Sequence, residues 1–344
     1  MSATSYAVMT KARSKYGRFL SDRDYAGLLA CQSVPEVMVY LKSHTHYASA
    51  LADVNERDVH RGRLEMLLRQ YLFDEFDSFC RYDSGVSACF SRYIIEKSEV
   101  EQIIRYLVLL NSQSTEKFIF QFPAFLAKHT VLDVNRIANA RDYDDFLDAL
   151  KRTPYFELLS GFKPDDKGQL PVSDIENKLY AQILSHVLAL IKKKTKGSER
   201  RELESIIKTV NDYAAFSRIL RMKKYYNLSP EIIKSYMLPE YGSLSPKLVN
   251  RMCEAESSAE VFQIMQSTGC GRLIGKIGYK HAGDISPRVQ YRLAKKHIHF
   301  SSNPTVVMVS FMFLSEIELM NIISLIEGVR YRIDPKTIQS LIIR

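Results

Sequence analysis

One glycine-rich segment has residue types that could bind a phosphate group. Residues 269–278 contain four glycines and a lysine. A phosphate loop of the type Gly-x4-Gly-Lys-Ser/Thr would need glycine at Cys270 and a hydroxyl at Ile277, and a dinucleotide fingerprint would need glycine at Ile274. Because neither spacing is met and no strand pattern precedes the segment, we interpret it as a flexible connection between helices.

Two other groups of side chains could act on a metal or a proton. His297 and His299 would point apart on a helix, and no third ligand lies near them in the sequence. Asp165 and Asp166 lie in a Pro/Gly turn, where such residues usually serve the loop itself. The cysteines are odd in number and lack a Cys-x-x-Cys pair, so we expect reduced thiols in a cytosolic protein: Cys31, Cys80, Cys89, Cys253 and Cys270. We therefore predict no catalytic residue, no metal site and no cofactor.

A cluster of lysines could bind an anion. Lys192, Lys193, Lys194 and Lys196 stand where a helix is expected to end, and cations are favourable at that end of the helix dipole. The alternative is that these lysines face an anion or a lipid.

A second basic cluster stands beside two tyrosines. Arg218, Arg221, Lys223 and Lys224 precede the tyrosine pair at 225–226, an arrangement that could stack RNA bases. No RNA-binding signature accompanies it, so we expect a mixed surface. The net charge of +9 at pH 7 leaves solvated lysines, nucleic acid, anionic lipid and an acidic protein partner open.

The elements that position these residues follow from a helical spacing of apolar side chains. Residues 59–79, 175–191 and 198–224 each place apolar residues at i, i+3, i+4 and i+7. Helix-start signals occur at Ser98, Ser173 and Ser229. Because alternating strand patterns are scarce, we predict an all-α fold.

We expect no membrane-spanning segment and no secretory signal. The longest apolar run, residues 306–314, is interrupted by Ser310 and is about half of the ~20 residues that a spanning helix needs. The polar start of the chain has no apolar segment after it of the kind that a signal peptide contains.

Three sequence elements recur at intervals of about 110 residues. Residues 228–238 match residues 333–343 at an offset of 105. Each of these segments has a proline at the first position of an apolar helix. Residues 114–119 form a weaker copy. The acids Glu99, Asp212 and Glu318 head a second element, in which Gln102, Ala215 and Asn321 correspond. The third element comprises residues 41–47, 150–155 and 265–270, each after a short helix with an acid: Glu36, Asp145 and Glu260. We predict three helical units, 1–130, 131–243 and 244–344.

These elements resemble the C-subunit family of the V-type ATPases, whose eukaryotic member is the d subunit. The resemblance lies in residues 204–224, 228–233 and 238–244, in the middle-repeat helix at 175–180 and in the closing segment 318–341. Ala215 stands where the family has asparagine, and Glu240 and Tyr241 precede Gly242 where the family has a glycine pair. The likeness covers most of the chain in order.

The resemblance implies a funnel of three pseudo-repeated helical bundles that catalyses nothing. Such a protein lies at the cytoplasmic face of the membrane as a peripheral central-stalk adaptor. It links the shaft of subunits D and F to the proteolipid ring and transmits torque for ATP-coupled proton or sodium transport. No nucleic acid and no small-molecule substrate is expected as a partner.

We place the predicted partner contacts on Arg218, Arg221, Glu318, Asn321 and Glu327. The alternative is that these side chains form hydrogen bonds or caps inside the bundles. Two other functions stay open: a stand-alone basic helical-repeat protein that binds RNA or anionic lipid, and an enzyme whose site has no sequence signature.

Overall fold

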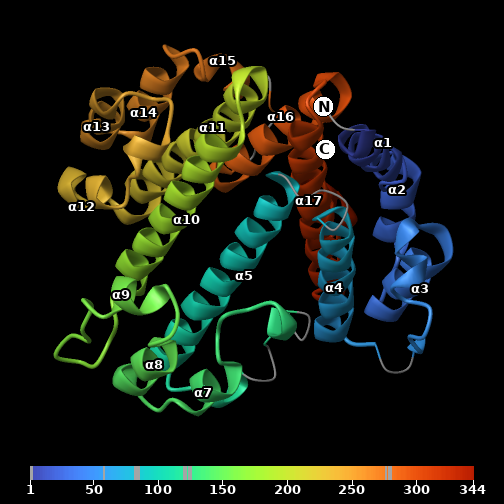
Figure 1. Cartoon of the computed structure of the whole chain (residues 1–344), viewed down its shortest axis with the longest axis horizontal. Coiled ribbons are helices and arrows are strands. Elements are labelled where there is room, and N and C mark those ends of the chain that lie inside the picture. Colours follow the sequence, from blue (N-terminus) through green and yellow to red (C-terminus); the bar gives the residue numbers. More distant parts are fainter. Residues whose placement is uncertain are drawn as a thin grey trace. The chain divides into compact units, whose positions relative to one another are not determined.

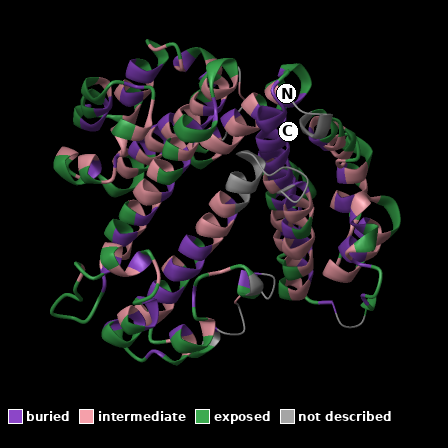
Figure 2. Cartoon of the chain, in the orientation of Figure 1, coloured by how far each residue is buried: buried purple, intermediate pink, exposed green. Residues whose placement is uncertain are grey.

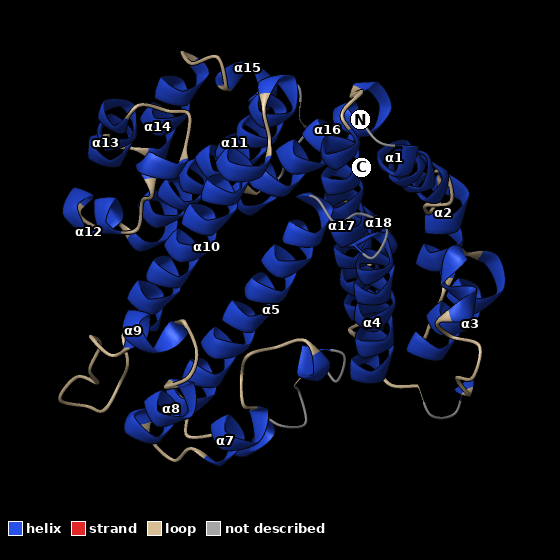
Figure 3. Ribbon diagram, viewed as in Figure 1, coloured by secondary structure: helices blue, strands red, loops and turns tan. Residues whose placement is uncertain are grey.

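A computed structural model of the chain describes residues 3–56, 59–80, 86–118, 122, 126–275, 277 and 281–344. Within these residues every regular element is helical and no strand occurs (Figure 3). The all-α prediction is therefore confirmed. The chain divides into two compact units, of which one comprises Met1–Ser87 with Lys194–Arg344 and the other Ala88–Lys193.

The unit Ala88–Lys193 is built between two long helices. The long helices are α5 (Val86–Asn111) and α10 (Val172–Lys194). Between them in the chain lie η3 (Thr115–Lys117), η4 (Leu126–Lys128), α7 (Val134–Asn139), α8 (Tyr143–Leu150) and α9 (Tyr155–Leu159) (Figure 1). Their apolar faces share one core, in which the rings of Tyr106 and Phe146 stack with centroids 4.7 Å apart.

The other unit joins the two ends of the chain. Its N-terminal elements are α1 (Ala3–Tyr16), α2 (Asp22–Ala30), α3 (Val34–His44), η1 (His46–Ser49) and α4 (Arg61–Cys80). Its later elements are α11 (Gly197–Arg221), η5 (Met222–Tyr226), α12 (Pro230–Ser235), η6 (Pro239–Tyr241), α13 (Pro246–Glu254), α14 (Ser258–Gln266), α15 (Gly271–Ile274), η7 (Ala282–Asp284), α16 (Ile285–Phe300), α17 (Pro304–Arg330) and α18 (Pro335–Leu341). One core cluster spans α11 to α16, and a second combines α2, α3 and α4 with α17 and α18.

Helix α17 is the central element of its unit. It contacts α16, α1 and α4 among others, and most of its residues are buried (Figure 2). It is long and apolar enough to cross a membrane by length and composition, but 83% of its most apolar window is buried inside the chain. A helix that is apolar all round and buried in this way is typical of a protein core.

The long helices α5, α11 with η5, and α17 end in the same way. Each is followed by a residue other than glycine with a left-handed backbone: Gln113 (φ 53°), Asn227 (φ 46°) and Arg332 (φ 52°). These are the only such residues in the described part of the chain. The last two lie 105 residues apart, which is the offset of the sequence repeat. A left-handed residue at this point lets the chain leave the helix and cap its last carbonyl groups.

The core clusters do not end at the predicted unit boundaries. Two of the clusters join the end of one long helix to the short helices that come after it, across residue 131 in one case and across residue 244 in the other. The three units 1–130, 131–243 and 244–344, and their arrangement as a funnel, stay predictions.

Candidate functional site: three buried carboxylates

Three buried acids lie at the positions that the second repeat element aligns. Glu99 is 0%, Asp212 3% and Glu318 4% exposed. Burial of a carboxylate is costly unless it is hydrogen-bonded, so its partners show what the group does. Each of the three binds a backbone N–H group that lies at least 31 residues away in the chain.

Glu99 binds the segment that leads into α7. Its Oε1 accepts from Val131 N–H at 2.7 Å and from the Thr130 hydroxyl at 2.9 Å. Its Oε2 accepts from the phenol of Tyr155 at 2.6 Å, and an Arg92 nitrogen lies 3.6 Å from the same oxygen. The acid therefore holds α5 to the loop before α7 and to the start of α9.

Asp212 binds the segment that leads into α13. Its carboxylate accepts from Ser243 N–H at 2.9 Å and from Leu244 N–H at 3.3 Å. Burial raises the pKa of this carboxyl, and the two backbone donors oppose that rise. A Cβ at Gly242 would overlap the carboxylate, so a residue without a side chain is needed there. Cys270 stands where the third repeat element has Tyr47 and Tyr155.

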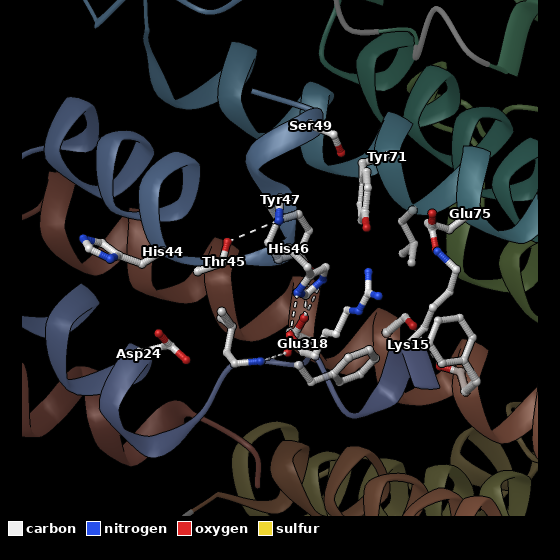
Figure 4. Close-up of a pocket in the computed structure, with 16 residues that line it drawn as sticks. Lys15, Asp24, His44, Thr45, His46, Tyr47, Ser49, Tyr71, Glu75 and Glu318 are labelled. Atoms are coloured by element: carbon white, nitrogen blue, oxygen red, sulfur yellow. Dashed lines mark hydrogen bonds and ion pairs between the residues drawn. The ribbon is translucent and has the colours of Figure 1, made fainter. Parts of the chain in front are cut away.

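Glu318 binds the segment that leads into α2 (Figure 4). Its Oε2 accepts from Leu20 N–H at 2.7 Å, and its Oε1 lies 3.1 Å from the Tyr47 phenol and 3.3 Å from His46 Nε2. Burial raises the pKa of this carboxyl to about 8, although the Leu20 and Tyr47 donors oppose the rise. Burial also lowers the pKa of His46, so both groups are mainly neutral at pH 7.

The neutral pair has one consistent arrangement of protons. His46 Nδ1 lies 2.9 Å from the Arg18 carbonyl, which can only accept, so Nδ1 carries the ring proton. Nε2 is then an acceptor, and the protonated Glu318 carboxyl donates to it. In this protonation state the contact is a hydrogen bond between neutral groups.

A cavity of about 460 Å³ opens beside Glu318. Lys15 and Glu75 form an ion pair in its lining, and Tyr71 stands above His46 with ring centroids 5.8 Å apart (Figure 4). The lining contains both acidic and basic side chains, and the described residues contain no group of three or more His, Cys, Asp or Glu side chains that could hold a metal ion.

Asn321 clamps the last residues of the chain. It donates to the Ile343 carbonyl and accepts from Ile343 N–H, both at 2.8 Å. Asn211 donates to the Leu238 carbonyl at 3.1 Å, and Leu238 lies 105 residues before Ile343. Asn211 is one helical turn before Ala215, the position at which the repeat lacks an amide, and residues four apart share a helix face. An amide side chain therefore binds the equivalent backbone position in residues 228–238 and in residues 333–343, although the two amides come from neighbouring turns of the repeated helix.

The other predicted contact residues divide between inner and outer positions. Glu327 pairs with Arg61, with Nε and Oε1 2.5 Å apart, and more weakly with Arg330 at 3.6 Å. Arg218 donates to the Tyr236 carbonyl at 2.9 Å. Arg221 is exposed at the end of α11. Glu318, Asn321, Arg218 and Glu327 therefore have partners inside the chain, and their predicted role in binding another subunit stays a prediction.

The predicted lipid-facing lysines are all exposed: Lys192, Lys193, Lys194 and Lys196. Lys194 is the last residue of α10, as the helix-end interpretation expects, and Lys196 precedes the first residue of α11. Their contact with an anion stays a prediction.

The chemically suggestive motifs have structural roles in the described residues. Gly271 in α15 lies too close to the backbone of Met265 and Gln266 for any side chain. Residues 276 and 278 of the glycine-rich segment lie outside the described residues. Asp165 accepts from its own loop, at Lys167 N–H and Gln169 N–H.

Sequence reasoning missed the backbone groups that the acids bind. A main-chain N–H has no residue signature, so nothing in the residue types of Leu20, Val131 and Leu244 marks them as donors. The acids of the third element give a local sequence signal for contacts of this kind. Each of them accepts from a backbone N–H group four residues earlier, at the start of a short helix. These pairs are Glu36 with Gln32 (2.9 Å), Asp145 with Arg141 (3.2 Å) and Glu260 with Glu256 (2.8 Å).

The fold and these contacts define an all-α protein whose buried polar side chains hold its own loops in place. A sequence model of the ATP synthase (C/AC39) subunit family matches residues 8–341. The chain belongs to this family.

A curated relative supports the same assignment. The C subunit of the A-type ATP synthase of Methanosphaera stadtmanae is 23% identical to this chain over 269 residues. The aligned part covers 77% of this chain and 66% of that relative, so the chain spans just under two-thirds of the relative's length.

Proposed function

We propose that this chain is a non-catalytic central-stalk adaptor of a rotary V-type ATPase. In this role it links a shaft of subunits D and F to the membrane proteolipid ring, at the cytoplasmic face, and transmits torque for ATP-coupled ion transport. The observation that carries the proposal is the family match over residues 8–341. The funnel of three pseudo-repeated bundles belongs to the same proposal.

The internal contacts support a stiff rather than a catalytic part. Long helices packed over closed cores resist bending, because close-packed interiors have low compressibility. Glu99, Asp212 and Glu318 each bind backbone N–H groups of their own chain. The three recurrences of this contact support the three-bundle arrangement.

Charge reversal at Arg221 tests whether the end of α11 contacts the shaft. Arg221→Glu changes an exposed side chain, so we expect binding to co-expressed D and F subunits to weaken by about tenfold, while the far-ultraviolet circular dichroism stays unchanged. Unchanged binding in a pull-down would remove Arg221 from the contact surface.

Glu327 needs a second variant because it pairs with Arg61 inside the chain. Glu327→Arg alone breaks that pair, whereas Arg61→Glu combined with Glu327→Arg restores an ion pair with the charges exchanged. Because Arg61 also pairs with Glu65, and Glu327 with Arg330, the double variant should regain only part of the lost stability. If Glu327 contacts the shaft, the double variant regains no binding. Recovery of both stability and binding would assign Glu327 a purely structural role.

A further inference from the structure

The most exposed large apolar side chain among the described residues lies at a helix end. Phe300 is the last residue of α16 and is 83% exposed. No other large apolar side chain in the described ranges is more than 64% exposed. A phenylalanine ring held in water forfeits the free energy that its burial would give, so burial of this ring against another surface would be favourable.

The backbone on both sides of this ring is held by side chains from other helices. Arg13 of α1 donates to the carbonyls of Ile298 at 2.7 Å and Ser301 at 2.8 Å. Glu202 of α11 accepts from the Ser301 hydroxyl at 2.7 Å and from the Asn303 amide at 2.6 Å. The turn between α16 and α17 therefore presents the ring from a backbone that is already held in place, which lowers the ordering cost of binding.

Helix α11 brings its first turn to the same place. Glu202 lies 3.4 Å from His297, whereas the Val210 carbonyl accepts from the Ser286 hydroxyl at 3.4 Å. The two helices therefore run antiparallel, and the start of α11 lies beside the end of α16.

Exposed cations surround this corner of the molecule. We call the ring and these side chains the basic tip: Phe300 with Lys194, Lys196, Arg201, Lys295 and Lys296. Residues 295–300 contain no acid, and the acids within residues 194–202 are the half-buried Glu199 and Glu202. The basic tip therefore carries a net positive charge.

We propose that the basic tip docks on an anionic phospholipid surface, with Phe300 inserted among the headgroups. An aromatic ring is favourable at the boundary between headgroups and acyl chains, and lysines beside it are attracted to anionic lipid. A single-stranded nucleic acid would favour several successive exposed rings along a groove, and the basic tip offers one large apolar ring. Net charge +9 makes the whole chain complementary to such a surface.

This inference adds a lipid contact to the proposed adaptor role but does not depend on the shaft. Vesicle binding is measured on the purified full chain alone, whereas the adaptor role is tested by binding to D and F subunits. One can therefore fail without the other.

Co-sedimentation with vesicles tests the inference. We expect binding to phosphatidylcholine vesicles that contain about a third phosphatidylglycerol, little binding to pure phosphatidylcholine, and a loss of binding as salt rises. Phe300→Ser should weaken binding about tenfold, and Lys295→Gln with Lys296→Gln by at least about tenfold. Because these side chains are exposed, the variants should keep the helicity and melting temperature of the parent.

The matched control is Tyr331→Ser. Tyr331 is 64% exposed beside Arg330 and Arg332, and it follows the opposite end of α17, which is 27 residues or about 40 Å long. We expect less than a twofold change. An equal loss in the control and in Phe300→Ser would overturn the proposal, as would binding to a polyuridine oligonucleotide but not to the anionic vesicles.

Discussion

The carboxylates of Glu318 and Asp212 both hold a backbone segment in place, but they do so with different numbers of hydrogen-bond partners. Both are buried in the unit that joins the chain ends, and both accept backbone N–H groups from the segment before a short helix. Glu318 also binds the phenol of Tyr47 and the imidazole of His46, whereas Asp212 accepts its hydrogen bonds from backbone groups. The difference shows that the backbone contact is the common feature and that the side-chain partners vary around it.

The largest expected effect is the removal of Glu318. Glu318→Ala leaves the Leu20 N–H and the Tyr47 phenol buried without an acceptor, at about 1–3 kcal/mol each, so we expect a loss of about 3–5 kcal/mol in the free energy of unfolding. Asp212→Ala should cost less, about 2–3 kcal/mol, because its side chain is shorter and accepts from backbone groups alone. Urea denaturation followed by circular dichroism gives both values. A larger cost for Asp212→Ala would reverse the comparison.

The pH dependence of the Glu318 contribution should be the next largest effect. A folded-state pKa of about 8 against 4.5 when unfolded means that the folded chain binds the proton more tightly. The stability that Glu318 adds is therefore complete below about pH 4.5 and falls steadily as the pH rises toward 8. The lowered pKa of His46 acts with the opposite sign, since its stability is lost as the pH falls below 6.5.

Glu318→Gln separates these two contributions. The difference in unfolding free energy between the parent and this variant cancels most of the His46 contribution and should shrink as the pH rises from 5 to 8. A difference that stays constant with pH would show that Glu318 titrates normally in the folded chain.

The smallest expected effect on stability comes from the tyrosine phenol that binds Glu318 and Glu99, a partner that Asp212 lacks. Tyr47→Phe removes one hydrogen bond to Glu318 and should cost about 1 kcal/mol, as should Tyr155→Phe at Glu99. Cys270→Ala, at the equivalent position beside Asp212, should cost less than either phenol. Thermal unfolding of the three variants in parallel checks the order, and a Cys270 effect above the other two would contradict it.

The fold class was predictable because its signal is local. Apolar residues at helical spacing act within a few residues of the chain. Of the predicted helix starts, Ser229 caps α12 and Ser173 lies in the first turn of α10, whereas the start at Ser98 was wrong, because Ser98 lies inside α5. The proline at the start of α12 and of α18 was likewise readable from the sequence.

The partners of the candidate site residues were not predictable in the same way. The repeat aligned Glu99, Asp212 and Glu318 correctly as a set, but the groups they bind are main-chain N–H groups up to 298 residues away in the chain. Burial of Glu318 and Asn321 arises from the all-round packing of α17, and an acid or amide in an apolar helix does not reveal by itself whether it faces a partner subunit or its own loops.

The most direct test of the adaptor role is whether this chain bridges the two parts it is proposed to connect. Membranes that contain the proteolipid ring are mixed with purified D and F shaft subunits, with and without this chain, and the shaft bound to the sedimented membranes is measured. The adaptor account predicts that the shaft sediments only when this chain is present, in near-equal amounts with it. Equal recovery of the shaft with and without the chain would contradict the account.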